Sequence, residues 1–213
     1  METTARGNVP KTLHNIAFVS IPESADLEFL LWDLQDAIAA YAQLSGTVLP
    51  HPVDLKANDA GSVADGIVLA VEDMTDDEAM ADIAKALDRF GDTGTRVYVV
   101  VRAACERSEG ARMLIERLRQ ACELRRLTWC GGVIACTGSG IAKLRHSPRM
   151  GILRRPFSEA MDKLVGAVRM GCSVEHAQLL GGGGVSNFDP DGVITAKPAI
   201  PTWLWRLATR HCG

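Results

Sequence analysis

Apolar and polar positions follow two different periods along this chain, and the periods predict strands and helices in alternation. The nearly unbroken apolar runs Gly66–Val71 and Arg96–Val101 are typical of strands that are buried on both faces. Between them, over Thr75–Phe90, apolar residues recur every three or four positions, as on the inner face of a helix. The pattern therefore predicts units of strand, helix and strand rather than an all-helical or all-β chain.

Five strands and five helices are predicted in this way. The strands are Asn15–Ile21, Thr47–Asp54, Gly66–Val71, Arg96–Val101 and Thr128–Cys136. The helices are Asp26–Ser45, Thr75–Phe90, Ser108–Leu124, Phe157–Met170 and a short one at Trp203–Thr209. Alternation of this kind predicts an α/β fold: a three-layer, doubly wound, five-stranded parallel sheet with helices on both faces, in the flavodoxin-like order 2-1-3-4-5.

The alternating pattern weakens near residue 173, and this sets the predicted domain organisation. Residues 1–172 are expected to form the flavodoxin-like domain, and residues 173–213 a C-terminal arm with a short helix. The Gly- and Pro-rich stretch 181–201 is expected to be an ordered arm or a flexible loop. The arm is expected to pack on the same domain or on a partner subunit, through Trp203, Trp205 and Leu207.

Composition and charge exclude several classes of protein. The 213 residues are 47% apolar and 23% charged, which suits one domain with a full core. The net charge of −3 offers nothing global to attract nucleic acid or an anionic membrane. No apolar run is long enough to span a bilayer, and the first residues carry no apolar signal-peptide region. Six scattered cysteines without metal-ligand spacing favour a reduced, cytoplasmic protein with no metal site.

In a doubly wound sheet, ligands bind beyond the carboxyl ends of the strands. Here four loops form this strand-end rim: Ser20–Ser24, Glu72–Thr75, Arg102–Ser108 and Thr137–His146. The first loop has two interpretations. The hydroxyls of Ser20 and Ser24 could donate to a phosphate, or Ser24 could simply cap the following helix. Glu23 and Asp26 repel a phosphate, and the loop contains no glycine.

The second and third loops also leave alternatives open. Acidic residues after Glu72 could bind a metal ion, but a capping box of Thr75 and Glu78 explains them as helix-start residues. A phospho-acceptor receiver domain is excluded, because the first strand does not end in an acidic pair. Cys105 near Arg102 could be a thiol of lowered pKa or a small buried side chain.

The fourth loop combines glycines with positive charge. Gly138–Gly140 permits close approach of the backbone to a ligand, although it is a poor dinucleotide fingerprint. Segment 143–155 follows with five basic residues and no acid. It could be a solvated loop or a site for an acidic ligand such as a nucleotide phosphate.

The second half of the chain resembles flavodoxin-like NAD(P)H-dependent FMN reductases. The resemblance covers residues 65–213 and is carried by VYVVVRAACERSEGARMLIERLRQACELRRLTWCGGVIACTGSG and by the ending AIPTWLWRLATRHCG. The matching positions are Cys105, Glu106, Cys122, Trp129, Gly131, Gly132 and Gly138. The first half departs from that family, because Ile21–Asp26 replaces a Gly-Ser-x-Arg-type phosphate loop and Val71–Met74 replaces a Pro-x-Tyr-like turn.

The resemblance implies an oxidoreductase that binds FMN and takes NAD(P)H as co-substrate, with a small-molecule electron acceptor. The flavin would supply the hydride chemistry, so no side chain is assigned as a catalytic acid or base. The implied cofactor-binding residues are Ser20, Glu23, Ser24, Glu72, Asp73, Met74, Arg102, Ala103, Ala104, Cys105, Glu106 and Gly138. A homodimer is expected as well, since such reductases commonly are dimers and the C-terminal arm carries apolar area.

A second hypothesis follows from the departures in the first half. The chain would be a flavodoxin-like module with a degenerate flavin site that serves as a binding or assembly protein. A hydrolase or transferase on the same topology is a third hypothesis, for which the sequence offers no nucleophile motif.

Overall fold

The computed structural model describes residues 9–46, 51–53, 64–73, 76–104, 109–181 and 192–211. The strands are β1 (Asn15–Ile21), β2 (His51–Val53), β3 (Gly66–Glu72), β4 (Arg96–Arg102), β5 (Thr128–Ala135) and β6 (Val193–Ala196). The helices are α2 (Ala25–Ser45), α3 (Asp77–Phe90), α4 (Glu109–Leu124), the 3₁₀ helix η1 (Ile141–His146), α5 (Arg155–Met170), α6 (Val174–Leu180) and α7 (Thr202–His211).

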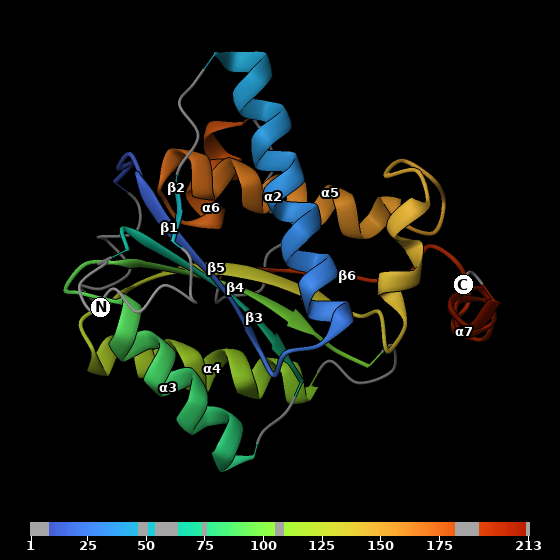
Figure 1. The fold of residues 1–213 in the computed structure, drawn as a ribbon, viewed down its shortest axis with the longest axis horizontal. Helices are drawn as coiled ribbons and strands as arrows, with labels where there is room; N and C mark the ends of the chain where they lie inside the picture. The colour runs from blue at the N-terminus through green and yellow to red at the C-terminus, as the bar shows by residue number, and fades with distance from the viewer. Residues whose placement is uncertain are drawn as a thin grey trace.

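The strands form one parallel sheet in the order β2-β1-β3-β4-β5-β6. The predicted fold class and the order 2-1-3-4-5 are therefore confirmed, and a sixth strand extends the sheet beyond β5. Figure 1 shows α2, α5 and α6 on one face of this sheet and α3 and α4 on the other. Each face has its own buried apolar cluster, as expected of a three-layer fold with a central sheet buried on both sides.

A glycine of β5 lets the neighbouring strands β4 and β5 approach each other closely. A Cβ at Gly132 would lie 2.0 Å from the carbonyl oxygen of Val99. Its neighbour Gly131 has φ +88°, next to an irregularity in the register of the two strands. The Trp-x-Gly-Gly sequence therefore has a structural reason that does not depend on any ligand.

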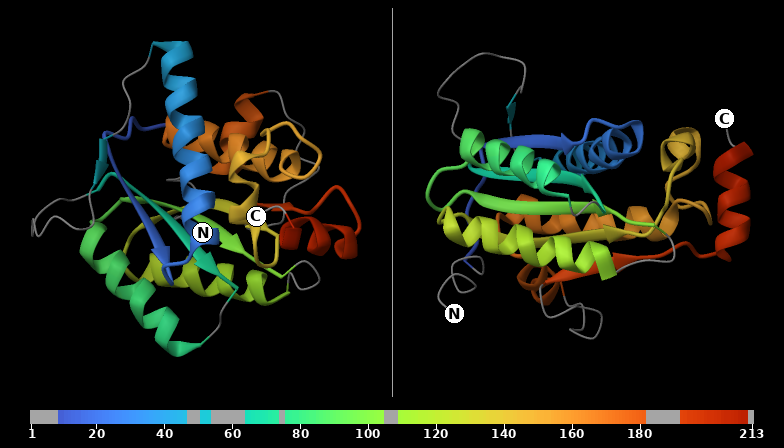
Figure 2. Two further views of the ribbon diagram at one scale, coloured as in Figure 1. Left: turned by 45° about the vertical axis from the view of Figure 1, so that its right-hand side comes forward. Right: turned by 90° about the horizontal axis from the view of Figure 1, so that it is seen from below.

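Two elements within residues 173–201, a helix and a strand, were not among the predicted ones. Val174–Leu180 is a helix capped by Ser173, and Val193–Ala196 pairs in register with Gly132–Ala135 of β5. Both elements are short, so neither produces a periodic pattern long enough to be recognised. Figure 2 shows α7 standing at the edge of the molecule after β6.

Helix α7 docks on its own chain through Trp205, one of the three side chains expected to pack. Trp205 is buried, and its Nε1 donates to the carbonyl oxygen of Thr137. It also packs on Phe157, with ring centroids 5.2 Å apart. Trp203 is 67% exposed and Leu207 48% exposed, so of the three expected side chains Trp205 is the one that docks within this chain.

The start of α3 also differs from the expectation. Asp76, not Thr75, is the N-cap, and its side chain accepts the N–H of Ala79. Thr75 lies outside the described residues, and the helix begins at Asp77. Helix capping remains the explanation of these acids, with a different residue as the cap.

Asp65 holds the chain segment before β1 against the start of β3. Its carboxylate accepts the backbone N–H groups of His14 and Asn15, and the ammonium of Lys11 lies 3.2 Å away. Partial burial acts to raise the pKa of Asp65, but these donors lower it below its ordinary value.

Candidate functional site

Arg102, the last residue of β4, is the centre of the strand-end rim. Its Nη2 lies 2.7 Å from Oε1 of Glu72, which ends the neighbouring strand β3. Its Nη1 donates to the carbonyl oxygen of Gly138 at 2.7 Å and lies 3.9 Å from Oδ2 of Asp26. One guanidinium thus connects four separate segments of the chain, because the carboxyl ends of parallel strands meet at one edge.

Asp26, in the first turn of α2, makes the second half of this network. Its Oδ2 accepts the N–H of Gly140 at 2.8 Å, and its Oδ1 accepts the N–H of Ala142 at 2.9 Å. These amides belong to the start of η1, the position at which a helix binds an anion. The Asp26 carboxylate therefore binds the N–H groups of the glycine loop, where the sequence suggested that an acidic ligand could bind.

The loop between β1 and α2 is short. Only Pro22, Glu23 and Ser24 lie between the last residue of β1 and the first residue of α2. Proline has no N–H, and the Ser24 hydroxyl caps α2 by accepting the N–H of Leu27. The capping interpretation of Ser24 is confirmed.

The remaining predicted residues are spread around this edge. Ser20 is half-buried within β1, and Glu23 is exposed. Ala103 is buried and exchanges backbone hydrogen bonds with Ala135 and Gly138, whereas Ala104 is exposed. Met74, Cys105 and Glu106 lie outside the described residues, as do residues 107–108.

Asp73 adds a further carboxylate to the same edge. Its N–H donates to the carbonyl oxygen of Arg102, which continues the pairing of β3 with β4. A Cβ at Gly110 would lie 2.6 Å from Oδ1 of Asp73, so this carboxylate packs against the first turn of α4. The positive end of a second helix dipole thus has an acid of the chain beside it.

Most of basic segment 143–155 is bound to the protein itself. Arg154 is 4% exposed and pairs with Asp33 of α2, which is 2% exposed. Nη1 of Arg149 lies 3.2 Å from the same Asp33 carboxylate, and its Nη2 lies 2.7 Å from Asp162. Arg155 pairs with an acid of its own helix α5. Arg149 and Arg154 are thus ion-pair partners within the fold, whereas Arg155 forms an exposed pair on the surface of α5.

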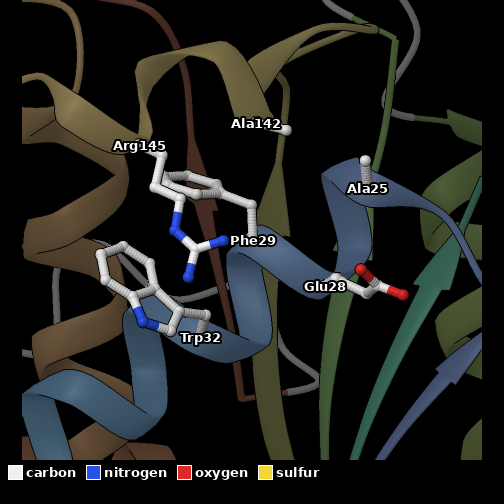
Figure 3. A pocket seen from close by; sticks show the side chains of 6 residues that line it. All are labelled: Ala25, Glu28, Phe29, Trp32, Ala142 and Arg145. Carbon is white, nitrogen blue, oxygen red and sulfur yellow. The ribbon is translucent and has the colours of Figure 1, made fainter.

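A small hollow lies beside the rim, between the first two turns of α2 and helix η1 (Figure 3). Its volume is about 320 Å³. The lining residues are Ala25, Glu28, Phe29, Trp32, Ala142 and Arg145. The guanidinium carbon of Arg145 lies 4.6 Å from the ring centroid of Trp32, a cation–π contact.

The cysteines within the described parts of the chain are free and buried, namely Cys122, Cys130, Cys136 and Cys172. Burial raises the pKa of Cys122 and of Cys130 to about 12. At such a pKa these two thiols are protonated at neutral pH. The burial of all four described cysteines matches the expectation of mostly buried thiols. Among the described side chains, no group of three or more His, Cys, Asp or Glu is arranged to hold a metal ion. In the same ranges, no helix combines the length and the apolar character needed to cross a membrane.

The sequence identified Arg102 at the strand-end rim but not the carboxylates that pair with the arginines of this region. From the sequence, Asp26 is a residue that repels phosphate, and nothing in the sequence analysis assigns a role to Asp33. The signal for Asp33 is an acid among the apolar residues of a helix, while five bases occur together elsewhere. The contact of Arg145 with Trp32 has no signal in the sequence, because it joins helices that are far apart along the chain.

Comparison with known proteins adds no family assignment. No protein-family model matches the chain, and a search of curated proteins gives no match. The resemblance to FMN reductases therefore stays a prediction.

Proposed function

We propose that this chain is a flavodoxin-like binding or assembly module with a degenerate flavin site, rather than an FMN-dependent oxidoreductase. The observation that carries the proposal is the position of the Asp26 carboxylate, which accepts two N–H groups at the start of η1 and lies near Arg102. Donors of this kind are what a flavin phosphate needs at the strand-end rim, and here they already serve an anion of the protein.

The charges around the loop after β1 also oppose an FMN phosphate. Glu23 precedes α2, and Asp26 and Glu28 lie in its first turn. Two like charges at about 4 Å repel by about 1 kcal/mol in water and by several times more near a protein surface. The site residues expected from the reductase resemblance thus fit the phosphate of FMN poorly, and the proposed function includes no flavin chemistry.

The test is a titration with FMN, followed by quenching of flavin fluorescence, on the wild type, Glu23→Gly and the double variant Glu23→Gly/Asp26→Asn. We expect no saturation of the wild type at ligand concentrations of about 100 µM, and tighter binding as each acid is removed. Glu23 is exposed, so Glu23→Gly keeps the test valid should Asp26→Asn loosen η1. Asp36→Asn, on the exposed side of α2, is the matched control and should leave binding unchanged.

A protein that purifies yellow, or that binds FMN at low micromolar concentration, would overturn the proposal. It would restore the reductase hypothesis, with NAD(P)H as co-substrate and a small-molecule electron acceptor.

A homodimer also remains a proposal. It is supported by the exposed Trp203 and Leu207 on α7 but no longer by Trp205, which is buried within its own chain. A cytoplasmic location is likewise proposed, on the strength of the free, buried thiols.

A further inference from the structure

The hollow beside the rim is formed by one face of each of two helices. Glu28, Phe29 and Trp32 lie three, four and seven residues after Ala25, which places all four on one side of α2. Ala142 and Arg145 are three residues apart on the 3₁₀ helix η1, where that spacing aligns side chains. Asp26 fixes the start of η1 to α2, so both walls are held in place independently of any ligand.

Arg145 differs from its basic neighbours in what it contacts. Arg149, Arg154 and Arg155 each lie within 4.0 Å of a carboxylate, whereas within the described ranges Arg145 has only the ring of Trp32 against its guanidinium. The side chain of Arg145 is exposed at the pocket, with Trp32 supporting one face of the planar group (Figure 3). A guanidinium held in this way is prepared for a planar anion, above all a carboxylate.

Glu28 provides the opposite charge on the other side of the same pocket. Figure 3 shows its carboxylate away from Arg145, and no ion pair joins the two among the residues that the structure describes. The two alanine methyls and the ring of Phe29 add an apolar part to the lining. The pocket thus offers a cation, an anion and an apolar surface to one small ligand.

We propose that this pocket binds a free α-amino acid with an apolar side chain, its carboxylate on Arg145 and its ammonium toward Glu28. This inference rests on the proposed binding function and names its ligand class. A ligand with only negative charge would meet Glu28, and one with only positive charge would meet Arg145, so a zwitterion satisfies both. The volume of about 320 Å³ lies at the small end of ligand pockets, which span about 300–1,000 Å³.

The test is calorimetric titration of the full chain with L-phenylalanine and L-leucine, and with two analogues that each lack one charge. These analogues are 3-phenylpropionate, without the ammonium, and 2-phenylethylamine, without the carboxylate. We expect both amino acids to bind, and both analogues to bind about tenfold or more weakly than L-phenylalanine.

Three variants assign binding to the pocket. Arg145→Gln and Glu28→Gln should each weaken binding of L-phenylalanine by about tenfold, and Ala142→Leu should abolish it by filling the hollow. The backbone N–H of Ala142, which Asp26 accepts, is retained in Ala142→Leu. Arg155→Gln and Asp36→Asn remove one exposed charge each away from the pocket and should leave affinity unchanged.

The inference is wrong if neither amino acid binds, if 3-phenylpropionate binds as tightly as L-phenylalanine, or if the control variants lose as much affinity as Arg145→Gln. These outcomes are separate from the flavin test. If the chain binds neither FMN nor amino acids, the pocket assignment fails while the binding module stands. If it binds both, the binding-module proposal fails while the pocket assignment stands.

Discussion

Replacing Asp33 by Ala tests the buried ion pair that joins α2 to the segment before α5. In the folded chain the Asp33 carboxylate pairs with Arg154, and neither side chain is more than 4% exposed. The substitution leaves the Arg154 guanidinium buried without its counter-charge. Its Nη1 keeps the carbonyl oxygens of Arg145 and Ser147 as acceptors, which limits the loss.

Removing one partner of a buried ion pair lowers the free energy of unfolding by about 3–5 kcal/mol. Because Arg154 keeps two acceptors, we expect a loss of about 3 kcal/mol here. Arg149 adds little to the loss, because Asp162 remains as its partner. For a chain of this length, each kcal/mol shifts the melting temperature by about 2–4 °C, so Asp33→Ala should lower it by about 6–12 °C.

Urea unfolding followed by circular dichroism measures this loss, with Asp36→Ala on the exposed side of α2 as the control. The control should change the free energy of unfolding by no more than about 0.5 kcal/mol. The double variant Asp33→Leu/Arg154→Leu removes both charges and should be more stable than Asp33→Ala alone. If Asp33→Ala loses less than about 1 kcal/mol, the pair does not stabilise the fold as argued.

Three further predictions follow from the core and the anchoring contacts. Gly132→Ala should give little soluble protein, because its Cβ would lie 2.0 Å from a backbone carbonyl oxygen of β4, whereas Gly166→Ala on open helix surface should express normally. Cys122 and Cys130, whose pKa values are about 12, should react with iodoacetamide at about pH 8 only after unfolding, as peptide mass spectrometry can show. The pKa of Asp65 is lower in the folded chain than its ordinary value of 3.8. The ionised carboxylate therefore stabilises the fold fully above pH 3.8, and this stabilisation is lost as the pH falls through the lower pKa of the folded chain. Asp65→Asn should therefore lower the free energy of unfolding at about pH 6 but hardly at about pH 2, and an equal loss at both would contradict this.

The sheet could be predicted from the sequence because each long strand and helix has a recognisable pattern within its own residues. Strands β3 and β4 are buried on both faces and read as continuous apolar runs, and each long helix shows its inner stripe. Strand β6 could not be predicted in the same way. Its four residues follow a stretch rich in Gly and Pro, and among the described residues it pairs with β5, a strand far back in the sequence.

The position of the candidate site could be predicted from the sequence, but the partners of its charged and N–H groups could not. The topology alone brings the ends of β3 and β4 together, so the meeting of Glu72 and Arg102 follows from the strand order. Which anion fills the amides of Gly140 and Ala142 depends on a carboxylate more than one hundred residues away. Hydrogen bonds between residues so far apart produce no periodic pattern in the sequence. These bonds nevertheless decide whether the strand-end rim can bind a phosphate.

The pairing of β6 with β5 has a consequence for how the nascent chain folds during synthesis. Strand β5 ends at Ala135, whereas β6 begins at Val193. At about 5–20 residues per second, the ribosome needs roughly 3–12 seconds to add the intervening chain. During that interval the outer edge of β5 has no β6 to pair with, and an unpaired edge is a template for contact with other chains. Slow translation of this interval would therefore lengthen the period in which the growing chain can aggregate.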